Sequence, residues 1–510
     1  MLRMENRVYI IGGGLGGLFS GALLTKEGYK VTVFEKNHII GGGLQTFRRY
    51  GTGFETGMHM LGGLREGQSI NKICKYLGIF DKLKIRDLDV DCMDQITYAS
   101  DGRVLRIPEG REAFTHYFQE QFPDEAENVK AYVDALYAMV DQIDFYYLRT
   151  TNDHIFTHSE SFFWPADQFV AHYIKDEKLR DILGYMNPMY GGYEGHTPAY
   201  IHALINVLYI DGPSRFEGNS QQMADALAEV IQVGGGEVLN NSEVTHITIE
   251  ERQVKGIEVN GKTVEISPED DIKVVCSIHP AALLKITDEK AFPKSYRTRI
   301  TEAPNSYSSF CVYVVFKPET FPYINHVCYY QDDYGYVWNF DQYDEDNFPR
   351  GFLYLTPAEE NQGKYATKLI CNCPMTIDVC EKWADTKSGH RGPEYEAWCR
   401  KIADKFIDKL EQLYPGFRDS IAHIFTSSPL TIRDYYNEPD GALYGIHKDC
   451  VNIAEGQVPV FTKVRNLFMT GQNVNLHGFC GVPLTAINTT EAIVGMNKVT
   501  NKINEFNAQI

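Results

Sequence analysis

The sequence predicts an α/β protein in which a nucleotide-binding domain is assembled from separated segments and an α+β domain is inserted between them. A short apolar strand runs into a glycine-rich turn and a helix near the start, and a similar strand, glycine and helix return near the end. Between them lie long helical patterns and strand patterns that do not belong to a nucleotide-binding domain, which indicates an insertion. We place the nucleotide-binding domain at residues 1–84, 211–290 and 455–510, and the inserted domain at residues 85–210 and 291–454.

The first nucleotide signal is the run Gly12-Gly13-Gly14-Leu15-Gly16-Gly17, which satisfies the pattern G-x-G-x-x-G after an apolar strand at residues 8–11. In this pattern Gly12 makes a tight turn, Gly14 lets the backbone approach a diphosphate, and Gly17 allows close helix–strand packing. The helix N-terminus that follows attracts phosphate. The run therefore predicts a Rossmann-like dinucleotide site.

A second strand, "KVTVFEK", ends at Glu35, about 20 residues after the first glycine, where a carboxylate accepts the hydroxyl groups of a ribose. Lys36 follows it, and Gly42 and Gly43 belong to a second glycine cluster. This cluster resembles the extension of flavoproteins in which the chain returns over the FAD diphosphate. We therefore favour FAD over NAD and expect these residues to contact it.

Composition excludes several classes of function. The net charge of −19 argues against a nucleic-acid partner, whose phosphates require basic patches. The eleven cysteines are scattered without a paired C-x-x-C, so we expect reduced thiols and no metal site. Since no apolar run approaches the roughly 20 residues of a spanning helix, we expect a cytoplasmic protein, soluble or peripherally attached to a membrane.

The inserted segments carry other patterns. Residues 85–210 read as mostly helical, residues 334–340 ("YGYVWNF") read as a strand, and residues 393–413 read as an amphipathic helix. A hairpin turn is expected at Asn260-Gly261. Three aromatic residues in "SFFWPADQF" are a candidate membrane contact; they are Phe162, Phe163 and Trp164.

Longer motifs resemble one known family. "FETGMHMLGG", "SSPLTIRDYYNEPDGALYG" and "NLFMTGQNVNLHGFCGVPLTAINTTEAI" are similar to motifs of the phytoene desaturase, carotenoid isomerase and retinol saturase group of FAD enzymes. That group lies within the amine-oxidase-like flavoproteins, to which the GDP-dissociation inhibitors (GDI) are also related. Met58, where desaturases typically carry proline, and the closing "TGQNV" place the chain nearest the retinol saturase branch.

The resemblance implies further cofactor contacts. Val244 matches the position whose backbone meets the adenine, and Gly471, Gln472, Gly481 and Val482 match the C-terminal flavin-binding motif. A helix N-terminus there would face the flavin's pyrimidine edge and stabilise negative charge on the reduced ring. The chain departs from the family pattern in "FEGNSQQMADAL", which lacks the usual double glycine.

The resemblance implies an FAD-dependent oxidoreductase that acts on C=C bonds of an apolar polyene or isoprenoid lipid, as a saturase or desaturase, by hydride transfer at flavin N5. Hydride addition to one carbon requires a proton at the other. The candidate proton donors are His59, His477 and Tyr444. NAD(P)H is a candidate reductant. Because no separate NAD domain is visible, it would have to visit the flavin transiently.

Three alternatives stay open at this point. The first is non-redox cis-trans isomerisation of a carotenoid with reduced FAD. The second is a GDI-like prenyl-lipid binding protein without redox activity, which the intact fingerprint with Glu35 disfavours. The third is a conventional amine oxidase, for which no lysine or aromatic cage can be assigned. The sequence leaves the oligomeric state open.

Overall fold

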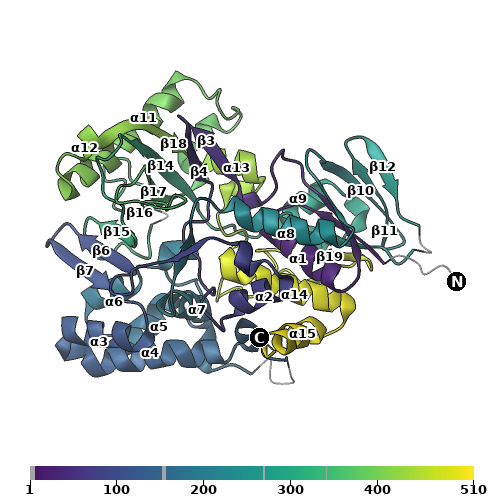
Figure 1. Ribbon diagram of the computed structural model, residues 1–510, viewed down its shortest axis with the longest axis horizontal. Coiled ribbons are helices and arrows are strands. Elements are labelled where there is room, and N and C mark those ends of the chain that lie inside the picture. The colour runs from purple at the N-terminus through teal and green to yellow at the C-terminus, as the bar shows by residue number, and fades with distance from the viewer. Residues whose placement is uncertain (1–5, 152–156, 268–269, 341, 510) are drawn as a thin grey trace.

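The computed structural model describes residues 6–151, 157–267, 270–340 and 342–509. A parallel sheet with its helices lies towards the right of Figure 1, a larger mixed sheet lies at the upper left, and a group of helices fills the lower left. This α/β architecture with an α+β insertion confirms the predicted fold class.

Five parallel strands form the first sheet, in the order β19-β13-β1-β2-β9. Their bounds are Arg7–Ile11 (β1), Lys30–Phe34 (β2), Glu237–Leu239 (β9), Lys273–Cys276 (β13) and Leu467–Met469 (β19). The strands β1 and β13 read as continuous apolar runs because parallel sheets are covered on both faces. Since the strands come from the beginning, middle and end of the sequence, the carboxyl edge of this sheet gathers loops from all three regions.

Helix α1 (Leu15–Lys26) packs against α14 (Gly478–Val494) and α8 (Gln221–Val233). The close approach depends on glycine, because a Cβ at Gly21 would lie 2.8 Å from the side chain of Ile231 on α8. The fingerprint glycines and Gly21 thus give α1 a smooth surface that two other helices can reach.

Three antiparallel strands form a small separate sheet: β10 (Val244–Glu250), β11 (Gln253–Val259) and β12 (Lys262–Glu265). Asn260 and Gly261 connect β11 to β12 with φ angles of 50° and 74°. Positive φ at both central residues is what a two-residue hairpin of the Asn-Gly type requires, so the predicted turn is confirmed.

Seven strands form the mixed sheet, in the order β18-β14-β17-β16-β15-β6-β7, with only β15 and β6 parallel to each other. Their bounds are Asp94–Tyr98 (β6), Arg103–Ile107 (β7), Ser308–Phe316 (β14), Val327–Gln331 (β15), Gly351–Leu355 (β16), Lys368–Met375 (β17) and Ile421–Ser427 (β18).

The two faces of the mixed sheet have different partners. Phe310, Val312 and Val314 of β14 join one apolar core with α11 (Pro393–Leu413), the predicted amphipathic helix. Cys311 and Tyr313, which alternate with them, belong to a different cluster on the opposite face. That opposite face is free to line a cavity.

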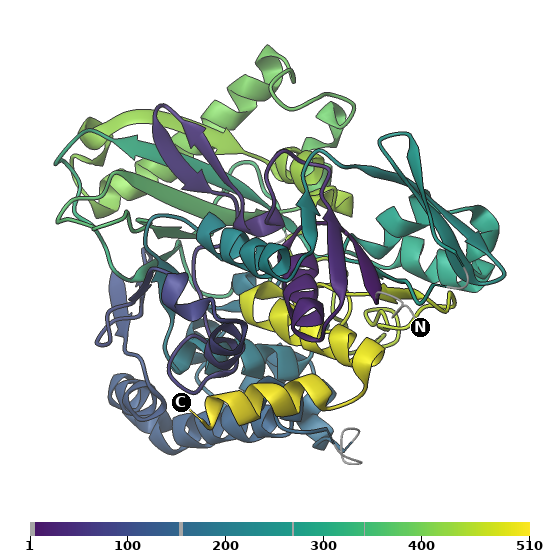
Figure 2. The same ribbon diagram turned by 45° about the vertical axis from the view of Figure 1, so that its right-hand side comes forward.

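The remaining helices and short strands surround these sheets. In Figure 2 the C-terminal helix α15 crosses in front of the lower helices, and it packs against α2. The bounds are Ser69–Leu77 (α2), Arg111–Gln121 (α3), Ala126–Asp141 (α4), Ala166–Tyr173 (α5), Glu177–Leu183 (α6), Ala199–Ile210 (α7), Pro280–Lys285 (α9), Lys294–Glu302 (α10), Phe417–Ser420 (α12), Pro429–Tyr436 (α13), Lys498–Asn507 (α15), Thr46–Arg49 (β3), Thr52–Glu55 (β4), Ile85–Asp87 (β5) and Ser214–Phe216 (β8).

The hairpin β3–β4 lies far from the glycine fingerprint that precedes it in sequence. Phe54 packs edge-to-face on Tyr313 and Phe425 of the mixed sheet, with ring centroids 5.4 and 5.0 Å apart. The Nζ of Lys368 on β17 donates a hydrogen bond to the carbonyl oxygen of Gly53 (2.7 Å). An N-terminal segment is therefore packed against the sheet of the inserted region.

Residues 85–210 are mostly helical, as expected, although β6 and β7 within them extend the mixed sheet. One expectation from the sequence is wrong, because residues 334–340 form no strand. Instead, the backbone N–H of Gly335 donates to Asp181 (2.9 Å) and the ring of Tyr334 stacks on Tyr98 at 3.9 Å. At this segment, a hydrogen bond from the backbone to a side chain takes the place of strand pairing.

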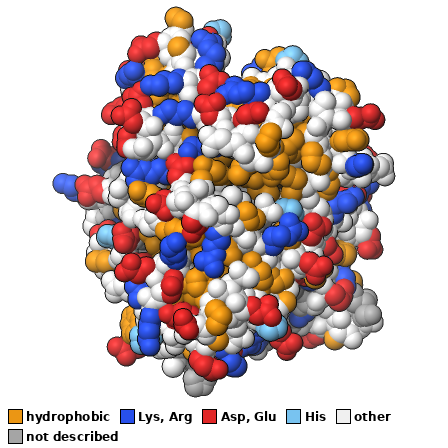
Figure 3. Space-filling model, turned by 90° about the vertical axis from the view of Figure 1, so that its left-hand side faces the viewer, with side chains coloured by type: hydrophobic (Ala, Val, Ile, Leu, Met, Phe, Trp, Pro, Cys, Tyr) orange, Lys and Arg blue, Asp and Glu red, His pale blue; other side chains and the backbone are white. Residues whose placement is uncertain are grey.

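The aromatic run proposed for membrane contact lies partly in the protein interior. Phe162 is buried and stacks on Tyr200 of α7 at 4.7 Å, whereas Phe163 and Trp164 are half-buried. Membrane contact by this run stays a prediction. Among the described helices, none combines the length and the hydrophobicity that crossing a bilayer requires. Figure 3 shows acidic and basic side chains interspersed over one face of the molecule, with hydrophobic side chains between them.

Candidate active site

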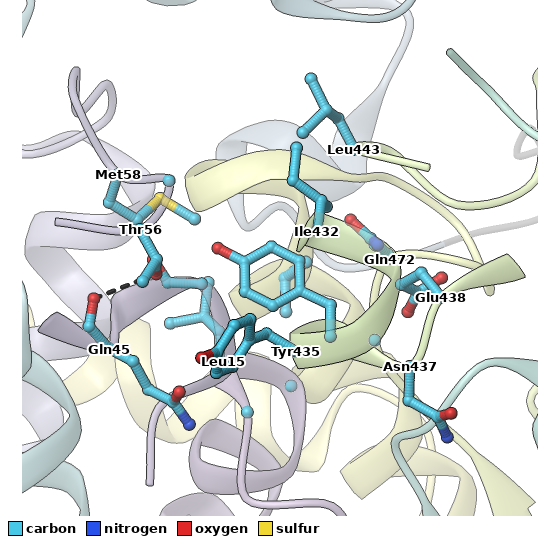
Figure 4. A pocket seen from close by; sticks show the side chains of 18 of the residues that line it. Leu15, Gln45, Thr56, Met58, Ile432, Tyr435, Asn437, Glu438, Leu443 and Gln472 are labelled. Carbon is cyan, nitrogen blue, oxygen red and sulfur yellow. Dashed lines mark hydrogen bonds between the residues drawn. The ribbon is translucent and has the colours of Figure 1, made fainter. Parts of the chain in front are cut away.

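One cavity of about 380 Å³ is lined by loops of the parallel sheet and by side chains of the mixed sheet. Helix α13 reaches into it, and Figure 4 shows Ile432 and Tyr435 of this helix between Thr56 and Met58 on one side and Glu438 and Gln472 on the other. Tyr435 is 58% exposed, so solvent reaches the cavity beside it.

Glycines form one wall of the cavity. A Cβ at Gly17 would lie 2.0 Å from the carbonyl oxygen of Gly12, and a Cβ at Gly16 would lie 2.8 Å from the Cα of Gly471. Gly12 itself has a φ of 98°, which side chains rarely adopt. Helix α1 begins just after this turn, at Leu15, with no acidic residue in its first turn. The backbone N–H groups at this terminus are therefore arranged for an anion such as a diphosphate.

The second glycine cluster folds over the first. The backbone N–H of Gly41 donates to the carbonyl oxygen of Gly13 (2.7 Å), and a Cβ at Gly42 would lie 3.1 Å from the Cα of Gly14. Only glycine permits two backbone segments to meet at this distance. The approach predicted for the second cluster is thus present.

Glu35 is fixed at the end of β2. Its Oε2 accepts a hydrogen bond from the N–H of Gly13 and its Oε1 accepts one from the N–H of Asn37, both at 2.8 Å. Glu35 is buried yet lines the cavity together with Val244. A carboxylate can accept about four hydrogen bonds, so the capacity to bind ribose hydroxyls remains.

The structure brings most of the predicted site residues into this one cavity. Those that line it are Gly12, Gly14, Leu15, Gly16, Glu35, Lys36, Gly42, Gly43, His59, Val244, Tyr444, Gly471, Gln472 and Val482. Gly17, Gly481 and His477 do not line it. Gly17 packs helix α1 on the strand, and Gly481 packs against Leu476, so both act through backbone packing.

The floor of the cavity is a row of residues across four strands of the mixed sheet. Ser427 of β18 pairs with Cys311 of β14, Cys311 pairs with Asn372 of β17, and Asn372 pairs with Leu353 of β16. Because side chains alternate between the two faces of a strand, this register turns all four towards the cavity, and all four line it. Leu355 lies in the next row on the same face.

Charged side chains are few in the lining. Among the described residues, the lining contains Glu35, Lys36, Glu243 and Glu438 as its Asp, Glu, Lys or Arg side chains. Three of them lie beside the fingerprint or Val244, and none lies on the sheet floor. The floor therefore suits an uncharged ligand.

His59 faces the cavity from the segment that follows β4. Burial, together with the positive charge of Arg215, lowers the pKa of His59 to about 4. Its Nδ1 has no hydrogen-bond partner among the described residues. At neutral pH the ring is thus uncharged and has a free nitrogen for a ligand.

The other two proton-donor candidates differ in position. His477 is the N-cap residue of α14 and lies behind Tyr444, with ring centroids 4.9 Å apart. Burial, together with the charges of Lys448 and His447, lowers the pKa of His477 to about 3. Tyr444 lines the cavity, but its hydroxyl donates to the carbonyl oxygen of Pro188 (3.0 Å) and burial raises its pKa. Neither side chain is arranged to give up a proton near neutral pH.

Comparison with known proteins decides the family. The model of the family described as flavin-containing amine oxidoreductase matches residues 15–355 of the 510-residue chain. The chain belongs to this family. The fold of this flavoprotein agrees, because it superposes on an oxidoreductase from Methanosarcina mazei with a TM-score of 0.64 at 16% identity, over 95% of this chain and 100% of that one.

Curated relatives narrow the resemblance. The all-trans-retinol 13,14-reductase of Rattus norvegicus is 24% identical, over 96% of this chain and 85% of the relative. The 4,4'-diaponeurosporene oxygenase of Staphylococcus haemolyticus is 21% identical, over 98% of both chains. The family recognised from the sequence motifs is thereby confirmed, and the flavoprotein is a flavin-dependent oxidoreductase.

The flavoprotein has a cavity that fits FAD. At Gly16 the backbone is so close to Gly471 that a side chain would not fit. The carboxylate of Glu35 can accept further hydrogen bonds. Helix α14 begins with no acidic residue in its first turn. These groups suit a diphosphate, a ribose and a ring that gains negative charge. Family membership implies a flavin cofactor.

Several lining residues escaped the sequence analysis. Cys311, Asn372 and Ser427 lie on three strands that no local motif brings together. Glu438 lies beside Gln472 in Figure 4, and burial raises the pKa of Glu438 to about 8. Its sequence, "NEPDG", is typical of a turn. The strand residues gave no local signal, because β14 is buried along its whole length and its sequence does not alternate between polar and apolar residues.

Proposed function

We propose that this flavoprotein reduces a carbon–carbon double bond of an apolar polyene or isoprenoid lipid. The observation that carries the proposal is the sheet floor, which includes Leu353 and Leu355 and, among the described residues, no charged side chain. The similarity to retinol reductases along 96% of the chain supports the same direction of reaction.

The walls above the floor support an elongated apolar ligand. Pro188, Met189 and Leu443 line the cavity as well. Burial of apolar surface contributes about 25 cal/mol per Å², so a long hydrocarbon can bind through contacts with these side chains alone. An amine substrate would instead need a group on the floor that handles its positive charge.

FAD, when bound, supplies the redox chemistry by giving or taking a hydride at N5. In the proposed arrangement Gly12, Gly14 and Gly16 hold its diphosphate, Glu35 holds its ribose, and the first turn of α14 stabilises negative charge on its ring system. An external two-electron donor must restore the cofactor, and we propose NAD(P)H for this role.

His59 has a positioning role in this proposal. Because its ring is neutral at neutral pH, it can orient a ligand or the cofactor through hydrogen bonds but is a weak proton donor. Tyr444 also lines the cavity, and its hydroxyl already donates a hydrogen bond to Pro188.

The test is to incubate the FAD-loaded protein with retinol, a carotene or an unsaturated fatty acid, each with dithionite or NADPH as electron donor. Product absorbance and mass are then followed. A gain of two hydrogens in retinol or the carotene is the expected result. A loss of two hydrogens would indicate desaturation, an unchanged mass with a shifted spectrum would indicate isomerisation, and either would overturn the proposal.

Two controls make the result specific. Glu35→Ala, which should lose FAD, tests whether product formation depends on the bound cofactor. Putrescine, a small amine, tests the exclusion of amine substrates; its oxidation by the FAD-loaded protein would contradict the interpretation of the floor.

A further inference from the structure

Cys311 lies on the floor of the cavity, within a set of hydrogen-bonding groups. The Nδ2 of Asn372 donates to its Sγ (3.4 Å), and the Oγ of Ser309 lies 3.5 Å from the same sulfur. The side chains of Ser427 and Tyr313 also lie close enough to this thiol to lower its pKa. A buried thiol that meets so many polar groups is unusual, because free cysteine commonly packs as a small apolar side chain.

The geometry of these groups is fixed by the sheet. Ser427, Cys311 and Asn372 lie side by side on three adjacent strands. The Oδ1 of Asn372 accepts a hydrogen bond from the Oγ of Ser309 (2.8 Å), which turns its amide nitrogen towards the sulfur. The Oγ of Ser427 and the hydroxyl of Tyr313 are 3.3 Å apart. The cluster is thus held by the strand register and by its own hydrogen bonds.

Two opposing effects act on the thiol. Burial raises the pKa of Cys311, so the sulfur holds its proton at neutral pH. The hydroxyl groups of Ser427 and Tyr313 oppose this rise, since they stabilise the thiolate, whereas the hydroxyl proton of Ser309 is donated to Asn372. The titratable groups nearest to it are otherwise uncharged; they are Tyr313, Tyr436, Cys371 and Cys373. The thiol of Cys311 is therefore protonated at neutral pH, and its surroundings also stabilise the thiolate that remains once the proton is given up.

We infer that Cys311 is the general acid of the proposed double-bond reduction, with Asn372 and Ser427 as the groups that stabilise its thiolate and Ser309 as the residue that orients Asn372. The inference rests on the proposed function and assigns the source of the proton that His59, His477 and Tyr444 are poorly suited to supply. The substrate class is an uncharged polyene lipid that lies across the sheet floor.

The step balances. A hydride carries two electrons to one carbon of the double bond, while the other carbon forms a C–H bond as the S–H bond of Cys311 breaks. The electron pair of that bond stays on sulfur, which becomes a thiolate and regains a proton from water. The two electrons come finally from the external donor, either a reduced nicotinamide or dithionite.

The first experiment compares three variants of the FAD-loaded protein with retinol and dithionite. Cys311→Ala and Cys311→Ser should bind FAD as the wild type does, as measured by its visible absorption, but lose at least about 100-fold in turnover, since a positioned proton donor contributes 10² to 10⁴. Cys371→Ala is the matched control, because this buried thiol of β17 faces the α11 core. It should turn over as the wild type does.

The outcomes separate the two proposals. A Cys311→Ala variant with bound FAD and wild-type turnover overturns the role of Cys311 and leaves the proposed function intact. A wild-type protein that binds FAD but reduces none of the lipids overturns the proposed function, and the assignment of Cys311 with it.

A second measurement tests the thiolate set without any substrate. The FAD-free protein is treated with iodoacetamide at several pH values, and alkylation at Cys311 is quantified by peptide mass spectrometry. Asn372→Leu and Ser427→Ala should each raise the pH at which half of Cys311 reacts, because each removes a group that stabilises the thiolate. An unchanged midpoint in both variants overturns the assignment of these groups.

Discussion

The glycine wall makes a sharp prediction, because two neighbouring glycines have different reasons to be glycine. In Gly17→Ala the new Cβ would lie 2.0 Å from the backbone oxygen of Gly12, and backbone cannot move aside as a flexible side chain can. Overpacking of this kind costs about 3 kcal/mol. In Gly14→Ala the new Cβ meets only the Cα of Gly42, at 3.8 Å, which is ordinary contact.

The two variants should therefore separate folding from cofactor binding. We expect Gly14→Ala to keep the stability of the FAD-free protein within about 1 kcal/mol, since the residue is an N-cap with a φ of −77° that alanine adopts. Its methyl group would keep the backbone away from the diphosphate. The loss of one charge-assisted hydrogen bond, about 1.5–3 kcal/mol, would weaken FAD binding about 10- to 100-fold.

The assay is urea unfolding of the FAD-free proteins together with FAD titration followed by flavin fluorescence. Gly17→Ala should lose both stability and FAD, and Gly14→Ala should lose FAD alone. A Gly14→Ala variant that binds FAD as tightly as the wild type would refute the reasoning that this backbone approaches the diphosphate.

Three further predictions follow from buried or cavity-lining groups. Glu35→Ala should weaken FAD binding about 10- to 100-fold through the loss of its ribose contact; unchanged affinity in isothermal titration would contradict the assignment. His59→Phe should keep FAD but lower turnover without moving the pH profile, because the pKa of His59 is about 4; a lost titration near neutral pH would show that the ring transfers a proton. Glu438→Gln should be more stable than the wild type at about pH 8 and similar to it at about pH 4. Burial raises the pKa of Glu438 from 4.5 to about 8, so the folded protein retains a proton that the unfolded chain releases, and wild-type stability falls as the pH rises between these values. Urea midpoints at both pH values check this sign, and a parallel fall in the variant would exclude Glu438 as its source.

The nucleotide half of the site could be predicted from sequence because its chemistry is local. The fingerprint from Gly12 to Gly17 and the carboxylate of Glu35 act at fixed distances along one strand, turn and helix. The physical requirement for glycine is equally local, since it arises from backbone that meets backbone. The role of those residues in binding a dinucleotide could therefore be predicted from the sequence alone.

The floor of the cavity could not be predicted in the same way. Cys311 and Ser427 become neighbours only through the register of β14 with β18, and no motif specifies a register between strands so far apart in sequence. Residues 334–340 show the converse, because their strand-like composition was overridden when Asp181, on a distant helix, bound the backbone. Long-range contacts decided both cases.

The hairpin β3–β4 has a consequence for protein engineering. Although it directly follows the second glycine cluster in sequence, its aromatic residue Phe54 packs among side chains of the mixed sheet, and Lys368 donates a hydrogen bond to its backbone. A chimaera that exchanged the fingerprint segment with that of another flavoprotein, and cut after this hairpin, would place a foreign aromatic surface on the sheet. Crossover points placed before Thr46 would keep the hairpin with its sheet. The units of this chain that pack together are therefore not the same as the segments that are consecutive in its sequence.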